Sequence, residues 1–336
     1  TIYLIRNWST LLGWLLCIRV YKSYVKYFEL IKKFKNLEIA LIDYDVLCPK
    51  TLILALENNN IKTFATQERF VHAFYTSTSN ANVIVDTYYT ASTYASDVIK
   101  KSKYYQINDV ITVGQYRSDR LSFYKRQSAP KEISKAKANG KKILIALGFH
   151  SPKNWFESHT DLILNWTAQI AFLDDIIKLS QNLENIFIVL RYKDLDWIKN
   201  EHFKKTIEKI HHHENIILSN NYEESYYSYK LCAHADLIIA KATSLADECL
   251  SKEIPVLFHE YTHNMKKIFL DVPNHVPSDL VCHTFEELYQ KSRSVLYSDS
   301  NKLRNAVKKM NQEIYYVSGR EDIKTKIIKD LEKRLI

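Results

Sequence analysis

One segment of the chain holds the residues whose types and spacing best suit chemistry. It runs from Ala235 to Phe258 with the sequence ADLIIAKATSLADECLSKEIPVLF. Thr243 and Ser244 follow an apolar run and stand where a helix would begin, so free backbone N–H groups there would attract a phosphate or another anion. Glu248, one helical turn later, could accept hydrogen bonds from a ribose diol. The alternative is structural, because hydroxyl residues cap helices and an acidic first turn complements the helix dipole.

Two series of alternating strands and helices would position these residues. Strands are expected at 39–43, 61–65, 83–85, 110–113, 142–147, 186–190, 216–218, 237–240 and 256–258. Helices are expected at 49–58, 94–103, 160–181, 203–212, 223–233, 245–251, 302–315 and 321–335. Short apolar strands divided by helices are typical of parallel, doubly wound sheets. The pattern predicts an α/β protein with two Rossmann-like domains that face a cleft, with the site at the carboxyl ends of the strands.

A polar, basic stretch divides the two series. Residues 125–142 read KRQSAPKEISKAKANGKK and contain Pro130 and Gly140, which favours a linker. We therefore expect a domain at 1–128 and a second domain at 141–336.

The charge of the chain is uneven. The net charge is +9, and residues 1–140 carry 20 basic and 11 acidic side chains while residues 141–336 carry 27 of each. Arginine makes the bidentate contacts that read bases, but only 11 of the 47 basic residues are arginine, so an anionic surface is favoured over nucleic acid. Five glycines in the whole chain exclude the glycine-rich dinucleotide and Walker A loops.

The first residues, 2–35, read as a basic amphipathic helix. Trp8, Leu11, Leu12, Leu15 and Leu16 are read as one apolar stripe, and Arg19, Lys22, Lys26 and Lys33 as a second, basic one. Either the apolar stripe packs on the core, or the segment lies on anionic lipid.

Neither a metal site nor a membrane span is expected. His259 and His263 are four residues apart but lack the carboxylate of a zinc motif, and prolines nearby indicate a loop. Five scattered cysteines without a C-x-x-C pair fit a reducing compartment. The longest apolar run, Leu11–Ile18, is far shorter than the roughly 20 residues that cross a bilayer.

The segment 235–258 resembles the donor-binding segment of GT-B glycosyltransferases. The nearest group makes bacterial surface polysaccharides and includes CDP-glycerol glycerophosphotransferases, Kdo transferases and sialyltransferase-like enzymes. Residues 111–121, ITVGQYRSDRL, are similar to the GxPRxDxL segment that closes the first domain of the glycerophosphotransferases. Residues 66–69, TQER, stand where many relatives carry Gln-His-Gly.

The resemblance implies a set of donor contacts on the second domain. Gly148 and His150 would approach the donor phosphates, and Arg191 and Lys193 stand in place of an RPHP-type segment whose histidine is missing. The alternative for these two cations is a surface position at the end of a strand. The expected donor contacts are Gly148, His150, Arg191, Lys193, Lys241, Thr243, Ser244, Glu248 and His259.

The resemblance also implies a general base and an acceptor side on the first domain. Glu68 replaces the histidine of Gln-His-Gly, and partial burial would raise its pKa toward the working pH. An ion pair with Arg69 is the alternative role of Glu68. Asp43 and Asp45 compete for the same catalytic role, and Asp86 is a weaker candidate. The expected acceptor-side residues are Gln67, Arg69 and Arg117.

Together these features predict a metal-independent, inverting glycosyltransferase that moves a sugar from a nucleotide-activated donor to a bacterial surface glycan, such as capsule or lipopolysaccharide. The nucleotide sugar is a substrate, so no cofactor is expected. The other partners are a glycan or glycolipid acceptor and an anionic membrane, with a location peripheral to the inner face of the cytoplasmic membrane. One alternative is a polyol-phosphate transferase that uses a CDP-alcohol, and another is a non-catalytic scaffold that binds an anionic polymer through residues 1–140.

Overall fold

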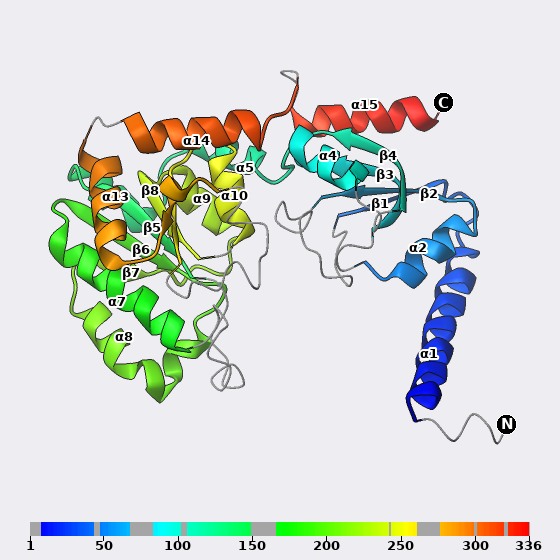
Figure 1. Ribbon diagram of the computed structural model, residues 1–336, viewed down its shortest axis with the longest axis horizontal. Helices are drawn as coiled ribbons and strands as arrows, with labels where there is room; N and C mark the ends of the chain where they lie inside the picture. The colour runs from blue at the N-terminus through cyan, green and yellow to red at the C-terminus, as the bar shows by residue number, and fades with distance from the viewer. Residues whose placement is uncertain are drawn as a thin grey trace. The chain divides into compact units, whose positions relative to one another are not determined.

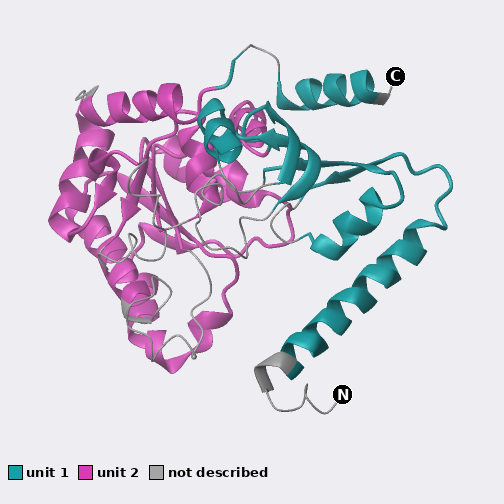
Figure 2. Cartoon of the chain, turned by 45° about the vertical axis from the view of Figure 1, so that its right-hand side comes forward, with its two compact units in different colours: residues 1–116, 317–336 teal, residues 117–316 magenta. Residues whose placement is uncertain are grey.

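The computed structural model consists of two compact units, each built on a parallel β-sheet (Figure 2). Unit 1 comprises Thr1–Tyr116 and Val317–Ile336, and unit 2 comprises Arg117–Tyr316. The structure describes residues 8–43, 48–67, 83–101, 106–148, 166–241, 243–260, 276–298, 301–318 and 322–335. The predicted α/β class with two Rossmann-like halves is confirmed.

Unit 1 contains a four-stranded parallel sheet in the order β1-β2-β3-β4. Its strands are β1 (Ile39–Ile42), β2 (Lys62–Thr66), β3 (Ile84–Thr90) and β4 (Gln106–Thr112). Its helices are α1 (Trp8–Ile31), α2 (Lys50–Glu57), α4 (Thr93–Lys101) and α15 (Ile323–Leu335). Because parallel crossovers are right-handed, a consecutive strand order places the connections on one face of the sheet and leaves the other face to be covered.

The C-terminal helix α15 covers that second face of the unit 1 sheet. Phe64 and Tyr89, each 1% exposed, pack with Ile323, and Ile327 and Leu331 add to the same apolar cluster. On the other face, Ile31 packs with Ala55, Leu56 and Ile61. Burial of both faces therefore requires a segment that lies more than 200 residues further along the chain.

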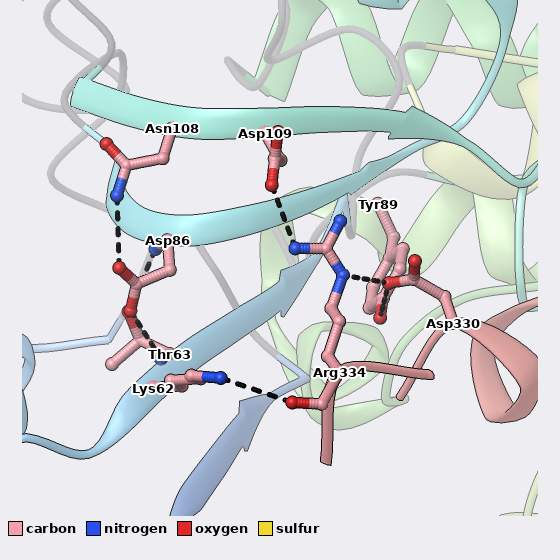
Figure 3. A network of polar contacts seen from close by, with 8 residues as sticks. All are labelled: Lys62, Thr63, Asp86, Tyr89, Asn108, Asp109, Asp330 and Arg334. Carbon is pink, nitrogen blue, oxygen red and sulfur yellow. Dashed lines mark hydrogen bonds and ion pairs between the residues drawn. The ribbon is translucent and has the colours of Figure 1, made fainter. Parts of the chain in front are cut away.

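Polar contacts also fasten α15 to the sheet (Figure 3). Arg334 donates through Nε to Asp330 and through Nη1 to Asp109, each at 2.8 Å. Asp330 also accepts a hydrogen bond from the hydroxyl of Tyr89 at 2.8 Å. Lys62 donates to the backbone carbonyl of Arg334 at 3.1 Å. The helix thus belongs to unit 1 by both apolar and charged contacts, which differs from the expected domain 141–336.

Unit 2 contains a six-stranded parallel sheet in the order β10-β9-β8-β5-β6-β7. Its strands are β5 (Lys142–Leu147), β6 (Ile186–Arg191), β7 (Ile216–Leu218), β8 (Leu237–Ala240), β9 (Val256–His259) and β10 (Val281–Cys282). This is the strand order of the dinucleotide-binding Rossmann fold, in which the order reverses between the first and fourth strands. Here that reversal lies between β5 and β8, where ligands bind in open α/β sheets.

Helices surround the unit 2 sheet (Figure 1). The α-helices are α5 (Asp119–Lys125), α6 (Lys131–Ala138), α7 (Trp166–Asn182), α8 (Lys204–His211), α9 (Tyr227–Ala233), α10 (Ser244–Leu250), α13 (Phe285–Tyr297) and α14 (Asn301–Glu313). Short 3₁₀ segments lie at Asp196–Lys199, Glu201–Phe203 and Ser278–Leu280. The predicted strands of this half agree with the structure to within about one residue.

The expected linker at 125–142 is instead part of unit 2. Pro130 occupies the N-cap position of α6, and Gly140 follows the helix with φ +73°. Ile133 and Ala136 are buried on the side of α6 that packs on β5 and β6. The proline and glycine that favoured a linker are therefore the start and stop signals of a short helix.

Candidate functional site

The candidate donor site is built where β5 and β8 diverge in unit 2. The backbone N–H of Gly148 donates to the carbonyl of Arg191 at 2.9 Å, and that of Lys241 donates to the carbonyl of Leu147 at 3.4 Å. These hydrogen bonds continue the sheet just beyond its strands and place three of the expected donor contacts at one edge. A ligand at the reversal point of the strand order would meet this edge.

Lys241 is the most unusual residue of the site. Its side chain is buried, with 4% exposure, and its ammonium lies 5.8 Å from the centre of the Phe172 ring. Burial lowers the pKa of Lys241 to about 8, against the opposing attraction of Glu260 and Asp175. A cation kept in apolar surroundings at a strand end has a strong preference for an anionic neighbour.

Two buried acidic residues that sequence reasoning missed surround Lys241. Asp175, on α7, is 3% exposed, and Glu260, directly after β9, is 4% exposed. Glu260 is anchored through its backbone, since its N–H donates to the carbonyl of Cys282 at 2.8 Å. Asp175 lies between Leu173 and Ile176 in a largely apolar stretch of the sequence, and this pattern could have indicated that its carboxylate is buried.

His259 is a buried partner of Asp175. Its Nε2 lies 3.1 Å from Oδ2 of Asp175, and its ring meets Phe172 edge to face at 5.2 Å between centroids. Burial lowers the pKa of His259, and the hydrogen bond with Asp175 opposes that shift. Lys178 contacts the other oxygen of Asp175 at 3.1 Å. In this geometry His259 and Lys178 each contact one oxygen of the Asp175 carboxylate.

Thr243 and Ser244 begin α10 and are partly exposed. Thr243 is the N-cap residue, with φ −145° and ψ 138°, but its hydroxyl makes no capping hydrogen bond. Simple capping, the alternative role of Thr243, is therefore not observed. Its hydroxyl remains near the strand end that carries Lys241.

Glu248 is held from inside unit 2. It is 3% exposed and accepts a hydrogen bond from the Tyr229 hydroxyl. Burial raises the pKa of Tyr229 and the hydrogen bond to Glu248 adds to the shift, while Arg117 and Arg120 lower it. Arg117, expected on the acceptor side, therefore belongs to unit 2 and lies near the Tyr229–Glu248 pair.

Arg191 is also engaged by its own unit. Its Nε donates to Ser228 at 3.0 Å and its Nη1 to Ser219 at 3.3 Å. The guanidinium lies 4.3 Å from the centre of the Tyr222 ring. Ser219 in turn donates to Glu132 of α6 at 3.2 Å. At 7% exposure Arg191 is not the surface cation of the alternative interpretation, whereas Lys193 is exposed.

The ring of Tyr192 leaves no room for a side chain at Gly148. A Cβ atom at this position would lie 2.2 Å from Cε1 of Tyr192, which is itself buried. Tyr192 packs on Trp197 with 4.6 Å between ring centroids. Close packing inside unit 2 thus explains the glycine without any approach to a phosphate.

Two of the residues expected to act in unit 1, Gln67 and Asp43, lie at the carboxyl ends of its strands. Gln67 is buried and accepts a hydrogen bond from the N–H of Ala91 at 2.8 Å, so it joins the ends of β2 and β3. Asp43 is exposed after β1, and its carboxylate accepts a hydrogen bond from Tyr116. Asp86 lies within β3, where Thr63 donates through both N–H and hydroxyl, so its role is structural. Glu68, Arg69, Asp45, His150 and His263 lie outside the described residues.

Within the described ranges, no group of three or more His, Cys, Asp or Glu side chains could hold a metal ion. Over the same ranges, no helix is long and apolar enough to cross a membrane.

No protein-family model and no curated protein sequence matches the chain. Solved structures share its architecture. MnaA of Staphylococcus aureus, in a co-structure with UDP, aligns with a TM-score of 0.61 at 15% identity over 94% of this chain and 79% of its own. The UDP-GlcNAc 2-epimerase of Neisseria meningitidis, bound to UDP-GlcNAc, aligns with a TM-score of 0.61 at 14% identity, over 94% of this chain and 81% of its own.

MurG of Acinetobacter baumannii aligns with a TM-score of 0.50 at 14% identity, over 88% of this chain and 74% of its own. These similarities show that the chain has the GT-B fold.

Proposed function

We propose that the protein transfers a sugar from a nucleotide-activated donor to a glycan acceptor of the bacterial cell surface. The observation that carries the proposal is the buried Lys241 cation beside the half-exposed Thr243 and Ser244, at the reversal point of the unit 2 sheet. The diphosphate of a nucleotide donor is an anion of the kind that a fixed ammonium group binds through charge-assisted hydrogen bonds. The similar folds of proteins solved with UDP and UDP-GlcNAc support a donor of this class.

In the proposed reaction, a bond forms between an acceptor oxygen and the anomeric carbon while the bond from that carbon to the donor phosphate breaks. The acceptor proton passes to a carboxylate of unit 1, with Asp43, Asp45 and Glu68 as candidates. Charge develops on the departing phosphate, so a fixed cation aimed at it lowers the barrier. Lys241 is the candidate for that role, and Asp175 and Glu260 position its ammonium.

Arg191, Lys193 and Glu248 have secondary parts in this proposal. Arg191 is committed to Ser219 and Ser228, so it would shape the wall of the donor site. Lys193 is exposed at the same strand end and is the better candidate for a direct phosphate contact. Glu248 already accepts a hydrogen bond from the hydroxyl of Tyr229, and its carboxylate could accept a further hydrogen bond from a ribose.

A second candidate is isomerisation of the sugar of a nucleotide sugar, which the fold of the Neisseria epimerase favours. The CDP-alcohol transferase is a third, supported by the similarity of residues 117–121 to the glycerophosphotransferase segment. The three differ in products. A transferase releases nucleotide in proportion to the acceptor consumed, whereas an epimerase releases none and changes the sugar.

The experiment is incubation of the full chain with UDP-, CDP- and CMP-linked donors, with and without a bacterial glycolipid fraction. We expect one donor to release its nucleotide only when the acceptor is present, and the mass of the glycolipid to increase by that of the transferred sugar. A changed sugar without nucleotide release would contradict glycosyl transfer and favour the epimerase. We propose a location at the inner face of the cytoplasmic membrane, where such an acceptor would be presented.

A further inference from the structure

The N-terminal half of α1 exposes large apolar side chains to an unusual degree (Figure 1, dark blue helix). The exposed fractions are 47–66% for Leu12, Trp14, Leu15, Leu16, Ile18, Val20 and Tyr21. Residues 8–18 contain no charged side chain. A cluster of this kind on a protein surface marks an interaction site.

Among the described residues of unit 1, the contacts that anchor α1 come from its C-terminal half. Tyr24, Tyr27 and Phe28 pack on the cluster that contains Ile31 and the α2 residues Ala55 and Leu56. Ser23 also contacts Thr51 at 3.1 Å, and Asn58 donates to the Tyr24 hydroxyl at 2.9 Å. These contacts fix which side of the helix faces α2 and hold the apolar half in place.

The exposed leucines and the basic residues share the side of α1 that faces away from α2. Leu15 precedes Tyr24 by nine residues, which is two and a half turns, so the two point in opposite directions. Arg19 and Lys22 follow Leu15 by four and seven residues and therefore lie on its face. The expectation of separate apolar and basic stripes is wrong, since one face is apolar in its first half and basic in its second.

The net positive charge of unit 1 lies in its first 35 residues. Unit 1 contains 19 basic and 13 acidic residues, a net charge of +6. Residues 1–35 contain seven basic residues and one acidic residue, also +6, so the rest of the unit is neutral overall. Unit 2 carries 28 basic and 25 acidic residues. Within α1 itself, Arg19, Lys22 and Lys26 follow the exposed apolar residues along the helix.

We infer that α1 binds an anionic lipid surface obliquely, with Leu12, Leu15 and Ile18 among the acyl chains and Arg19, Lys22 and Lys26 at the phosphates. Apolar side chains surround the helix between residues 12 and 18, and lipid covers all sides of such a segment whereas a second copy of the chain covers one. The adjacent cations would repel each other across a symmetric pair of α1 helices but attract anionic headgroups.

The length of the exposed apolar segment limits the depth of binding. The eight residues 11–18 span about 12 Å, which is less than half of a bilayer core of roughly 30 Å. We therefore expect this segment to lie at the level of the headgroups and upper acyl chains, at a depth of about 5–10 Å.

This inference rests on the proposed function only in its purpose, which is to bring the enzyme to a membrane-borne acceptor. The test is co-sedimentation of the full chain with phosphatidylcholine vesicles that contain or lack phosphatidylglycerol. We expect binding to the anionic vesicles, at least tenfold weaker without phosphatidylglycerol. Leu12→Glu/Leu15→Glu and Lys22→Glu/Lys26→Glu should each weaken binding at least tenfold.

The variants change exposed side chains, and Phe123→Glu in α5, at 53% exposure, is the matched control that should bind as the wild type does. Equal binding of all variants would overturn the inference. So would a dimer in light scattering that Leu12→Glu/Leu15→Glu dissociates, with no vesicle binding. Nucleotide affinity, measured on the same variants, should not change, which separates a failure here from a failure of the donor site.

Discussion

At the scale of single residues, buried ionisable groups define the candidate site. Lys241 was expected as one of the donor contacts that the resemblance of residues 235–258 to a GT-B donor-binding segment implies. Asp175 and Glu260 were not, because the fold alone brings α7 and the end of β9 beside Lys241. Sequence patterns can indicate which sheet edge carries a candidate site, but not which residues of distant elements shift the pKa of a buried group there.

Asp247 makes the stability of unit 2 depend on pH. It is fully buried on α10 and accepts a hydrogen bond from Tyr315 at 2.8 Å. Burial raises the pKa of Asp247 to about 7, partly opposed by that hydrogen bond. Between about pH 4 and pH 7 the folded state keeps a proton that the unfolded state has lost, so this group's contribution to stability falls as pH rises.

We therefore predict that Asp247→Asn flattens this decline and raises the free energy of unfolding at pH 7.5 by about 1–4 kcal/mol. Urea unfolding from pH 4 to pH 8 measures it. Asp196→Asn, at an exposed carboxylate, is the control and should follow the wild type. A parallel offset of Asp247→Asn at every pH would show that the carboxyl does not titrate in this range.

Gly148 gives a second prediction at this scale. A methyl group there would meet the buried Tyr192 ring, so Gly148→Ala should destabilise the protein by about 1–3 kcal/mol. In a Tyr192→Ala background, Gly148→Ala should lower the free energy of unfolding by about half as much or less. Equal costs in both backgrounds, measured by denaturant unfolding, would show that Tyr192 is not the reason for the glycine.

At the scale of elements, short strands were predictable and the ties between distant segments were not. Apolar runs of three to six residues locate nearly every described strand of unit 2. The segment around α6 was misread because Pro130 and Gly140 serve both linkers and helix ends, and only burial of Ile133 distinguishes the two. The packing of α15 could not be predicted, because α15 covers a face of the unit 1 sheet, whose strands lie near the other end of the chain.

The packing of α15 can be tested with two isoleucines of the same helix. Ile323 is 8% exposed and contacts Phe64 and Tyr89, whereas Ile328 is 41% exposed. Ile323→Ala should lower the free energy of unfolding by about 2–4 kcal/mol, and Ile328→Ala by less than about 0.5 kcal/mol. Similar effects of the two substitutions in thermal or denaturant unfolding would place α15 away from the sheet.

At the scale of the whole molecule, the units differ in what they offer a partner. Composition alone placed the whole net charge in residues 1–140, but residues 117–140 belong to unit 2 and carry seven basic and two acidic side chains. What remains of the charge difference between the units is the net charge of residues 1–35, which include helix α1. Unit 2 instead contains a small set of buried charged side chains at the edge of a Rossmann-type sheet, Lys241 and Arg191 among them.

The most direct test of the donor site is titration calorimetry of the full chain with UDP, CDP and CMP. We predict saturable binding of at least one nucleotide at one site per chain. Lys241→Met should weaken it about 10- to 100-fold, the loss of one charge-assisted contact. Lys209→Met, at an exposed lysine of α8, should leave it unchanged. Folded protein that binds none of the three, or Lys241→Met that binds as tightly as the wild type, would contradict a nucleotide-sugar site at the junction of β5 and β8.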